Sequence, residues 1–264
     1  MKHSLAGLKS VAIVGNGNVG NALKRALQQG QTGYVLHSST PARTLNKKAL
    51  QRLGGPEVLI IAAKDDAIAS TALSAMEACG ENLKLVLHLA GSMQSTVLPD
   101  IKGVARLTLH PIQTFPKSDP HLFDGITFMA SSESAPAIQW AKNFAKALGG
   151  REVITLPGDL LPVYHAMIVM GANFTTLLIA AVEDLSRSLQ LDTQKVKSAM
   201  TPLIQTSIAN ALESPAMEVL TGPIRRNDLV TIAAHRNALK KVAPEIGALY
   251  EAFVRYATKK TASE

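Results

Sequence analysis

The fold is decided by Val11-Ala12-Ile13-Val14-Gly15-Asn16-Gly17-Asn18-Val19-Gly20, near the amino end of the chain. Four apolar residues are typical of a buried parallel strand, and the pattern G-x-G-x-x-G follows them directly, before the helical pattern of residues 21–27. In such a strand-turn-helix unit Gly15 allows the tight turn, Gly17 leaves room for a pyrophosphate, and Gly20 lets helix and strand pack closely. The helix N-terminus would then face phosphate groups, the alternative being a glycine-rich turn that binds nothing. The residues expected to bind a dinucleotide here are Gly15, Asn16, Gly17, Asn18, Val19 and Gly20.

Composition describes a globular chain with a basic surface. The 264 residues are 47% hydrophobic, which suffices for one large domain or two smaller ones. The formal charge of +7 suits anionic partners, but Lys and Arg are scattered and no basic run is interleaved with aromatic residues. We therefore expect small anionic partners, such as a dinucleotide or a carboxylic acid, and no nucleic acid.

Cysteine usage and the amino end favour a cytoplasmic protein. Cys79 is the only cysteine, so the chain forms no internal disulfide and no cysteine-based zinc site, and we expect no metal. The amino end lacks the apolar stretch of a signal peptide. Residues 160–182 carry no Asp, Glu, Lys or Arg and are long enough to span a bilayer. Polar residues interrupt this segment, so we expect a buried central helix, enclosed by neighbouring helices or a second subunit, and no membrane contact.

The end of the second strand indicates which dinucleotide is bound. Residues 34–37 are typical of that strand, and Ser38-Ser39-Thr40-Pro41-Ala42-Arg43 follow. A site selective for NAD places Asp or Glu here to bind the ribose 2′-hydroxyl, and this sequence has neither. Hydroxyls at Ser38 and Ser39 with a cation at Arg43 suit a 2′-phosphate instead. The pattern predicts NADP, with an ordinary polar loop as the alternative.

Further apolar runs predict strands that alternate with helices as far as residue 156. In an open parallel sheet, ligands bind outside the carboxyl ends of the strands. Ala63, His88 and His110 follow or end three such runs, and His110 is followed by Pro111-Ile112-Gln113. Ala63 and His88 are therefore predicted to contact the cofactor and His110 to be catalytic. The alternative for each histidine is a loop residue bonded to backbone.

From residue 157 onward the pattern is helical almost throughout. We predict an α/β Rossmann-like fold with a doubly wound, mostly parallel sheet in residues 1–156, followed by a smaller all-α domain for substrate binding and dimerisation in residues 157–264. Tyr164, His165 and Asn173 are polar residues within the apolar helix. Buried polar groups need partners, which either a substrate or helix packing supplies. We predict that His165 and Asn173 are catalytic.

A second constrained turn lies at Leu220-Thr221-Gly222-Pro223-Ile224-Arg225-Arg226-Asn227-Asp228. Gly-Pro restricts the backbone, and Asp228 can cap the helix that follows. An arginine held on such a turn can bind a carboxylate with two parallel hydrogen bonds. We predict this role for Arg226, with a solvated basic turn as the alternative.

Taken together, four motifs resemble an uncharacterised oxidoreductase family that couples a Rossmann-like domain to a helical domain of unknown function. They are the glycine turn at residues 15–20, His110-Pro111-Ile112-Gln113, Tyr164-His165, and residues 220–223 with Arg226 and Asp228. More distantly, the architecture is similar to pyrroline-5-carboxylate reductase, ketopantoate reductase and the 6-phosphogluconate dehydrogenase superfamily. The resemblance implies an NADP-binding domain, a helical domain that often dimerises, and an active site between them.

Three functions fit these patterns. The first is an NADP-dependent reductase that transfers hydride to the C=O or C=N of a small, carboxylated metabolite, with His110 or His165 as general acid and Arg226 on the carboxylate. The second is a non-catalytic NADP(H) sensor. The third, from a similarity to deazaflavin-dependent NADP reductases, is reduction by or of a deazaflavin. We also expect a homodimer through the helical half.

Overall fold

The computed structural model describes residues 5–29, 32–42 and 55–261. It divides into two compact units, Met1–Ala172 and Asn173–Glu264.

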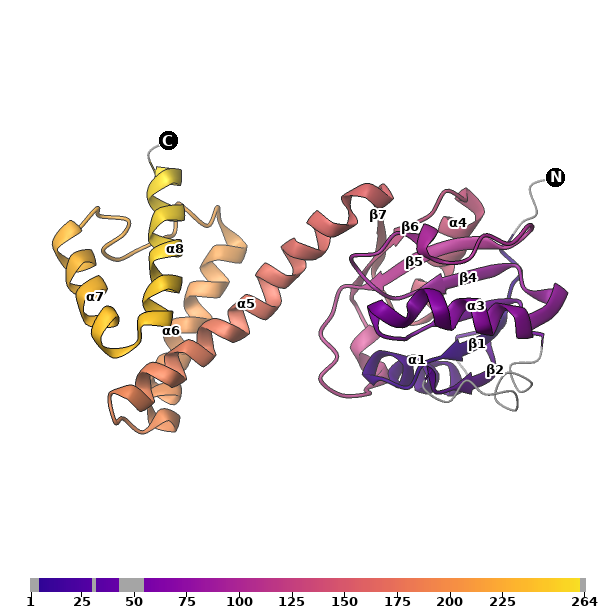
Figure 1. The fold of residues 1–264 in the computed structure, drawn as a ribbon, viewed down its shortest axis with the longest axis horizontal. Coiled ribbons are helices and arrows are strands. Elements are labelled where there is room, and N and C mark those ends of the chain that lie inside the picture. The colour runs from indigo at the N-terminus through magenta and orange to yellow at the C-terminus, as the bar shows by residue number, and fades with distance from the viewer. Residues whose placement is uncertain (1–4, 30–31, 43–54, 262–264) are drawn as a thin grey trace. The chain divides into compact units, whose positions relative to one another are not determined.

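The first unit is built on one seven-stranded sheet (Figure 1). Its strand order is β2-β1-β3-β4-β5-β6-β7. Strands β1 to β5 are parallel, β6 is antiparallel to β5, and β7 is parallel to β6. The strands are β1 (Ser10–Val14), β2 (Val35–Thr40), β3 (Val58–Ile61), β4 (Leu85–His88), β5 (Ala105–Pro111), β6 (Thr127–Ser131) and β7 (Glu152–Thr155). The predicted Rossmann-like, mostly parallel sheet is confirmed.

Helices cover both faces of this sheet. Alternate residues of β1 and β3 belong to two different core clusters, because successive side chains of a strand point to opposite faces. One cluster includes α1 (Asn18–Gln28) and α4 (Ala135–Ala147), and the other includes α3 (Ile68–Cys79). Burial on both faces explains why β1 and β3 read as continuous apolar runs.

After β7 every described element is helical, as predicted for the second half. The helices are α5 (Leu161–Ser188), α6 (Thr193–Glu213), α7 (Leu229–Val242) and α8 (Pro244–Thr261). The predicted cap Asp228 accepts hydrogen bonds from the Thr231 backbone N–H at 3.0 Å and from its hydroxyl at 2.7 Å. The predicted domain boundary at residue 156 follows the end of β7, whereas the division into compact units falls within α5.

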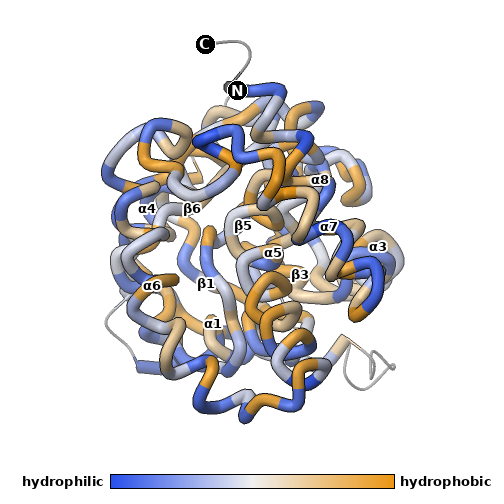
Figure 2. The backbone as a smooth tube through the Cα atoms, turned by 90° about the vertical axis from the view of Figure 1, so that its left-hand side faces the viewer, coloured by the Kyte–Doolittle hydropathy of each residue, from blue (hydrophilic) through white to orange (hydrophobic). Residues whose placement is uncertain are grey.

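The apolar helix α5 is not the buried central helix expected from the sequence. Val163, Met167 and Met170 are 71%, 59% and 62% exposed, and much of α5 is coloured as hydrophobic in Figure 2. The segment Gly158–Ser188 has the length and the mean hydropathy, 1.7, of a helix that could cross a membrane. Core helices of soluble proteins pass the same test. Neighbouring helices do not enclose these side chains among the described residues, and the second subunit that the sequence also allows stays a prediction.

Candidate functional site

In the glycine turn after β1, a side chain is sterically excluded at two of the three glycines. Gly15 adopts φ +133°, and a Cβ there would lie 2.1 Å from the Ala62 carbonyl oxygen. A Cβ on Gly20 would lie 2.7 Å from the Gly15 carbonyl oxygen, so the helix approaches the turn closely. Gly17, in contrast, has nothing within 4 Å of the Cβ position. The turn is thus packed on its inner side and open at Gly17.

The open side of the turn is the N-terminus of α1. Gly17 is the residue before the helix, it provides no side-chain cap, and the first helical turn contains no acidic residue. The first N–H groups of a helix have no partner within the helix and carry the positive end of its dipole. Asn18, Val19 and Gly20 contribute these groups. This end of α1 therefore suits an anion such as a phosphate.

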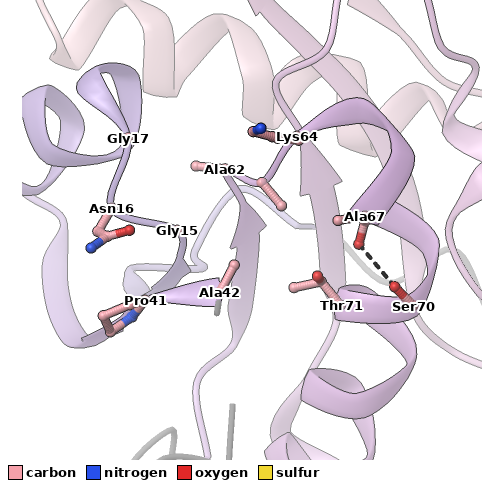
Figure 3. A pocket seen from close by; sticks show the side chains of 11 residues that line it. Gly15, Asn16, Gly17, Pro41, Ala42, Ala62, Lys64, Ala67, Ser70 and Thr71 are labelled. Carbon is pink, nitrogen blue, oxygen red and sulfur yellow. Dashed lines mark hydrogen bonds between the residues drawn. The ribbon is translucent and has the colours of Figure 1, made fainter. Parts of the chain in front are cut away.

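A cavity of about 660 Å³ lies at this turn (Figure 3). It is at the carboxyl ends of β2, β1 and β3. The chain leaves β1 toward β2 on one side and leaves β3 toward β4 on the other, and this change of direction marks the usual ligand site of an open α/β sheet. Its volume is within the ordinary range for small-molecule and cofactor sites. The lining residues are Gly15, Asn16, Gly17, Pro41, Ala42, Ala62, Ala63, Lys64, Ala67, Ser70 and Thr71. Gly15, Asn16, Gly17 and Ala63 are thus where the sequence predicts them.

Ser38 and Ser39, which the sequence predicts to bind the 2′-phosphate from a loop, lie in a strand. Strand β2 continues to Thr40, so Ser38 and Ser39 lie within the strand, paired with Ala12 and Ile13, and not in the loop that follows it. The predicted strand end at residue 37 is wrong because the edge pairing with β1 extends through three polar residues. Arg43 lies outside the described residues.

Lys64 is a cavity residue that sequence reasoning missed. It directly follows the apolar run of β3, is exposed, and lines the cavity opposite the glycine turn. The available indication was a cation at the end of the apolar run of residues 58–63. Among the residues that the structure describes, no acidic side chain lines the cavity.

The Asn18 side chain binds the protein itself. Its Nδ2 donates to the Phe115 carbonyl oxygen at 2.8 Å, and Arg25 donates to the Ser118 carbonyl oxygen at 2.8 Å. These two bonds hold the loop after β5 against α1. The backbone N–H of Asn18 remains the group that could contact a phosphate, while its side chain positions the loop.

His88, a predicted cofactor residue, is fully buried with both ring nitrogens engaged. Nδ1 accepts from the Ala90 backbone N–H at 3.3 Å. Nε2 therefore carries the proton, and it lies 3.2 Å from the Gln94 carbonyl oxygen and 3.1 Å from the Thr108 hydroxyl. Burial lowers the pKa of His88, which favours the neutral ring. These contacts indicate that His88 holds the loop after β4 in shape.

His110, Tyr164 and His165 form a cluster of three rings beside Gly91. Nδ1 of His110 lies 2.9 Å from the Tyr164 hydroxyl. The ring centroids of His110 lie 5.8 Å from Tyr164 and 5.7 Å from His165, with nearly perpendicular planes. Burial, followed by the charges of His165 and His88, lowers the pKa of His110 to about 4. The structure thus brings together the two predicted histidines, from β5 and from α5.

Asn173 and Arg226 belong to the second unit. Asn173 is an exposed residue of α5, and Arg226 lies in the turn before α7, where its backbone N–H donates to the Gly222 carbonyl oxygen at 3.3 Å. The Arg226 side chain is exposed, and its charge helps to lower the pKa of Asp228. The participation of Asn173 and Arg226 in one site with the histidines stays a prediction.

The family model described as "Domain of unknown function (DUF2520)" matches residues 126–257. The chain belongs to this family. The predicted resemblance, a Rossmann-like domain joined to a helical domain of unknown function, is therefore confirmed. No curated protein matches the sequence.

Solved structures resemble this DUF2520 protein over nearly its whole length. A candidate NADP oxidoreductase from Bacteroides fragilis, BF3122, is 22% identical with a TM-score of 0.76, covering 95% of this chain and 98% of the other. Protein TM1727 from Thermotoga maritima is 20% identical with a TM-score of 0.70, covering 96% and 99%. Pyrroline carboxylate reductase from Plasmodium falciparum, solved with NADP bound, is 13% identical with a TM-score of 0.60, covering 98% of each chain. At these identities the likeness establishes the fold.

Proposed function

We propose that this DUF2520 protein is an NADP-dependent oxidoreductase that transfers hydride to the C=O or C=N of a small, carboxylated metabolite. The observation that carries the proposal is the open N-terminus of α1, which faces a cavity of about 660 Å³ at the point where the sheet connections diverge. Two similar structures bear names that include NADP, BF3122 and the Plasmodium falciparum reductase, which supports the choice of cofactor.

The residues around the cavity fit a dinucleotide. Gly15, Asn16 and Gly17 would hold the pyrophosphate with the first N–H groups of α1, because no side chain occupies the Gly17 side. Ala62 and Ala63 leave room for the remainder of the molecule. When bound, the reduced cofactor supplies the hydride, and the protein supplies binding, orientation and protons.

A preference for NADP over NAD rests on charge. The described residues that end β2 and line the cavity include no carboxylate, which would repel a 2′-phosphate, and Lys64 adds a cation. We assign Lys64 to the anionic groups of the cofactor, in addition to Arg43.

The two histidines take different parts in the proposed reaction. Because its pKa is about 4, His110 is neutral near pH 7 and acts as a hydrogen-bond donor instead of an imidazolium acid. The general-acid role predicted for either histidine is therefore assigned to His165, which is partly exposed. Arg226 would bind the substrate carboxylate and Asn173 would orient the reacting group.

A homodimer is part of the proposal. The exposed apolar side chains of α5 include Val163, Met167 and Met170, and burying them against a second copy would remove a large apolar surface from water. The helix that carries His165 would then be covered on its apolar side.

Calorimetric titration with NADPH and with NADH tests this function. NADPH should bind at least ~10-fold more tightly, since the 2′-phosphate gains charge-assisted hydrogen bonds. Lys64→Ala should weaken NADPH binding, whereas Lys102→Ala, which changes an exposed lysine outside the cavity lining, should not. Absence of binding by both dinucleotides would refute the proposal. Binding without oxidation by any of a panel of keto acids and imines would favour the sensor instead.

A further inference from the structure

One wall of the cavity at the glycine turn is a helix face that carries two hydroxyl groups. Ala67, Ser70 and Thr71 line the cavity, and their spacing places them on one side at the start of α3 (Figure 3). The other lining residues between the end of β2 and the end of β3 have small, apolar side chains. They are Pro41, Ala42, Ala62 and Ala63. This part of the cavity therefore suits a flat, largely apolar group that has polar atoms along one edge.

Thr71 brings a free hydroxyl proton to this wall. The residue is only 7% exposed, and its hydroxyl has no hydrogen-bond partner among the described residues. Figure 3 shows the side chain directed from α3 into the cavity, toward the side that holds Ala42. A buried polar group without a partner is unfavourable, so a ligand acceptor at this position would gain a hydrogen bond without displacing one.

Ser70 presents the opposite hydrogen-bonding character. Its hydroxyl donates to the Ala67 carbonyl oxygen at 3.3 Å (Figure 3). A hydroxyl has one proton and two acceptor lone pairs, so with its proton directed to Ala67 the Ser70 oxygen offers the cavity an acceptor. Two adjacent residues of α3 thus present one acceptor and one donor.

The place of this wall indicates which half of the proposed cofactor it meets. Pro41 and Ala42 directly follow β2, where the ribose 2′-phosphate is proposed to bind, and that ribose carries the adenine base. From there the base would lie between Ala42 and α3. Adenine has an amino group, which donates, beside ring nitrogens that accept. This edge is complementary to an acceptor at Ser70 next to a donor at Thr71.

We propose that Ser70 accepts a hydrogen bond from the amino group of the adenine base, that Thr71 donates one to a neighbouring ring nitrogen, and that the two hydroxyls select adenine over hypoxanthine. Hypoxanthine carries a carbonyl oxygen in place of the amino group, so two acceptors would face each other at Ser70. This inference rests on the proposed function and adds to it the two residues that determine base selectivity.

Calorimetric titration with two pairs of nucleotides tests the base selectivity. NADPH and its hypoxanthine analogue deamino-NADPH differ only in the base, and NADPH should bind at least ~5-fold more tightly. Adenosine diphosphate and inosine diphosphate carry the same two bases without nicotinamide, and the adenine compound should again bind more tightly. Equal affinities within the dinucleotide pair, or within the diphosphate pair if no dinucleotide binds, overturn the inference. Adenine selectivity in the diphosphate pair without any binding of NADPH would refute the proposed function alone.

Three hydroxyl variants of α3 test the two residues. Ser70→Ala should weaken NADPH binding several-fold and leave deamino-NADPH unchanged, so that the two affinities become nearly equal. Thr71→Val keeps the shape of the side chain and should also weaken NADPH binding several-fold. Ser74→Ala is the matched control, because it removes an exposed hydroxyl of the same helix outside the cavity lining and should change neither affinity. The natural affinity ratio in Ser70→Ala, or natural NADPH affinity in Thr71→Val, would overturn the proposal.

Discussion

The three glycines of the first turn have three different environments. Gly15 is restricted by its backbone angle and by the Ala62 carbonyl, and Gly20 by contact with the turn itself, whereas Gly17 borders open space. A methyl group is therefore excluded by the protein at Gly15 and Gly20, and only by a ligand at Gly17. This difference allows binding and folding to be separated by single substitutions.

Gly17→Ala should leave the fold intact and impair dinucleotide binding. The added methyl group meets no protein atom within 4 Å but occupies the approach to the α1 N-terminus. We expect NADPH affinity to fall at least ~10-fold in calorimetry, since the phosphates lose close contact with backbone N–H groups. Gly7→Ala is the control, because Gly7 also has nothing within 4 Å and lies outside the cavity lining. Equal affinities for the two variants would show that the turn does not approach the phosphates.

Mild acidification should lower the free energy of unfolding because His110 has a lowered pKa in the folded chain. Its pKa is about 4 in the folded chain and 6.5 ordinarily, so between these values the unfolded chain binds more protons. The free energy of unfolding is therefore highest above pH 6.5 and decreases as the pH is lowered, by about 2 kcal/mol at pH 5 from this residue. Urea denaturation at pH 7.5 and pH 5 measures the change. His110→Asn should show a smaller decrease over the same interval, and an identical decrease would contradict the lowered pKa.

Helix α5 carries two residues of the ring cluster and also an exposed apolar surface. Its first turn places Tyr164 and His165 beside His110, while Val163, Met167 and Met170 leave an apolar surface exposed. Such a surface on a long helix is typical of an interface with another subunit. The loop after β5 is held by α1, and the N-terminus of α1 borders the cavity.

Charging the exposed side of α5 should dissociate the proposed dimer. In Met167→Glu/Met170→Glu, two carboxylates would have to be desolvated in the interface, which is unfavourable by several kcal/mol. Sedimentation equilibrium at micromolar protein should show a dimer for the natural sequence and a monomer for the variant. Leu73→Glu, which changes a 53% exposed leucine on α3, should remain dimeric. A natural chain that is monomeric under these conditions would refute the dimer.

Unfolding of the two units can be followed with different spectroscopic probes. Trp140 is the only tryptophan, and it is fully buried in α4 of the first unit, with Nε1 bonded to the Leu8 carbonyl oxygen at 3.2 Å. Its fluorescence therefore reports unfolding of the first unit, whereas far-UV circular dichroism includes the strong contribution of the helical second unit.

NADPH should stabilise the first unit selectively. A ligand at 100 times its Kd stabilises the folded state by about 2.7 kcal/mol. The fluorescence-detected thermal transition should move upward with NADPH and less with NADH at equal concentration. Under the same conditions Gly17→Ala should show little shift. A fluorescence transition that NADPH leaves unchanged would place any binding outside the unit that contains the glycine turn.

The sequence by itself determined the features that depend on local chemistry. Apolar runs predicted the parallel strands because both faces of such a sheet are buried, and the glycine spacing predicted the turn because steric exclusion acts within a few residues. The cap at Asp228 was predictable for the same local reason. The end of β2 was not, since strand pairing overrode the polar character of Ser38 and Ser39.

Only the tertiary structure decided what the polar residues do. Nothing local distinguishes His88, whose nitrogens are both engaged inside the protein, from His110, whose Nε2 faces Gly91. The contact between His110 and Tyr164 joins residues 54 positions apart. Burial and hydrogen bonding depend on such distant neighbours, so periodicity and spacing cannot reveal them.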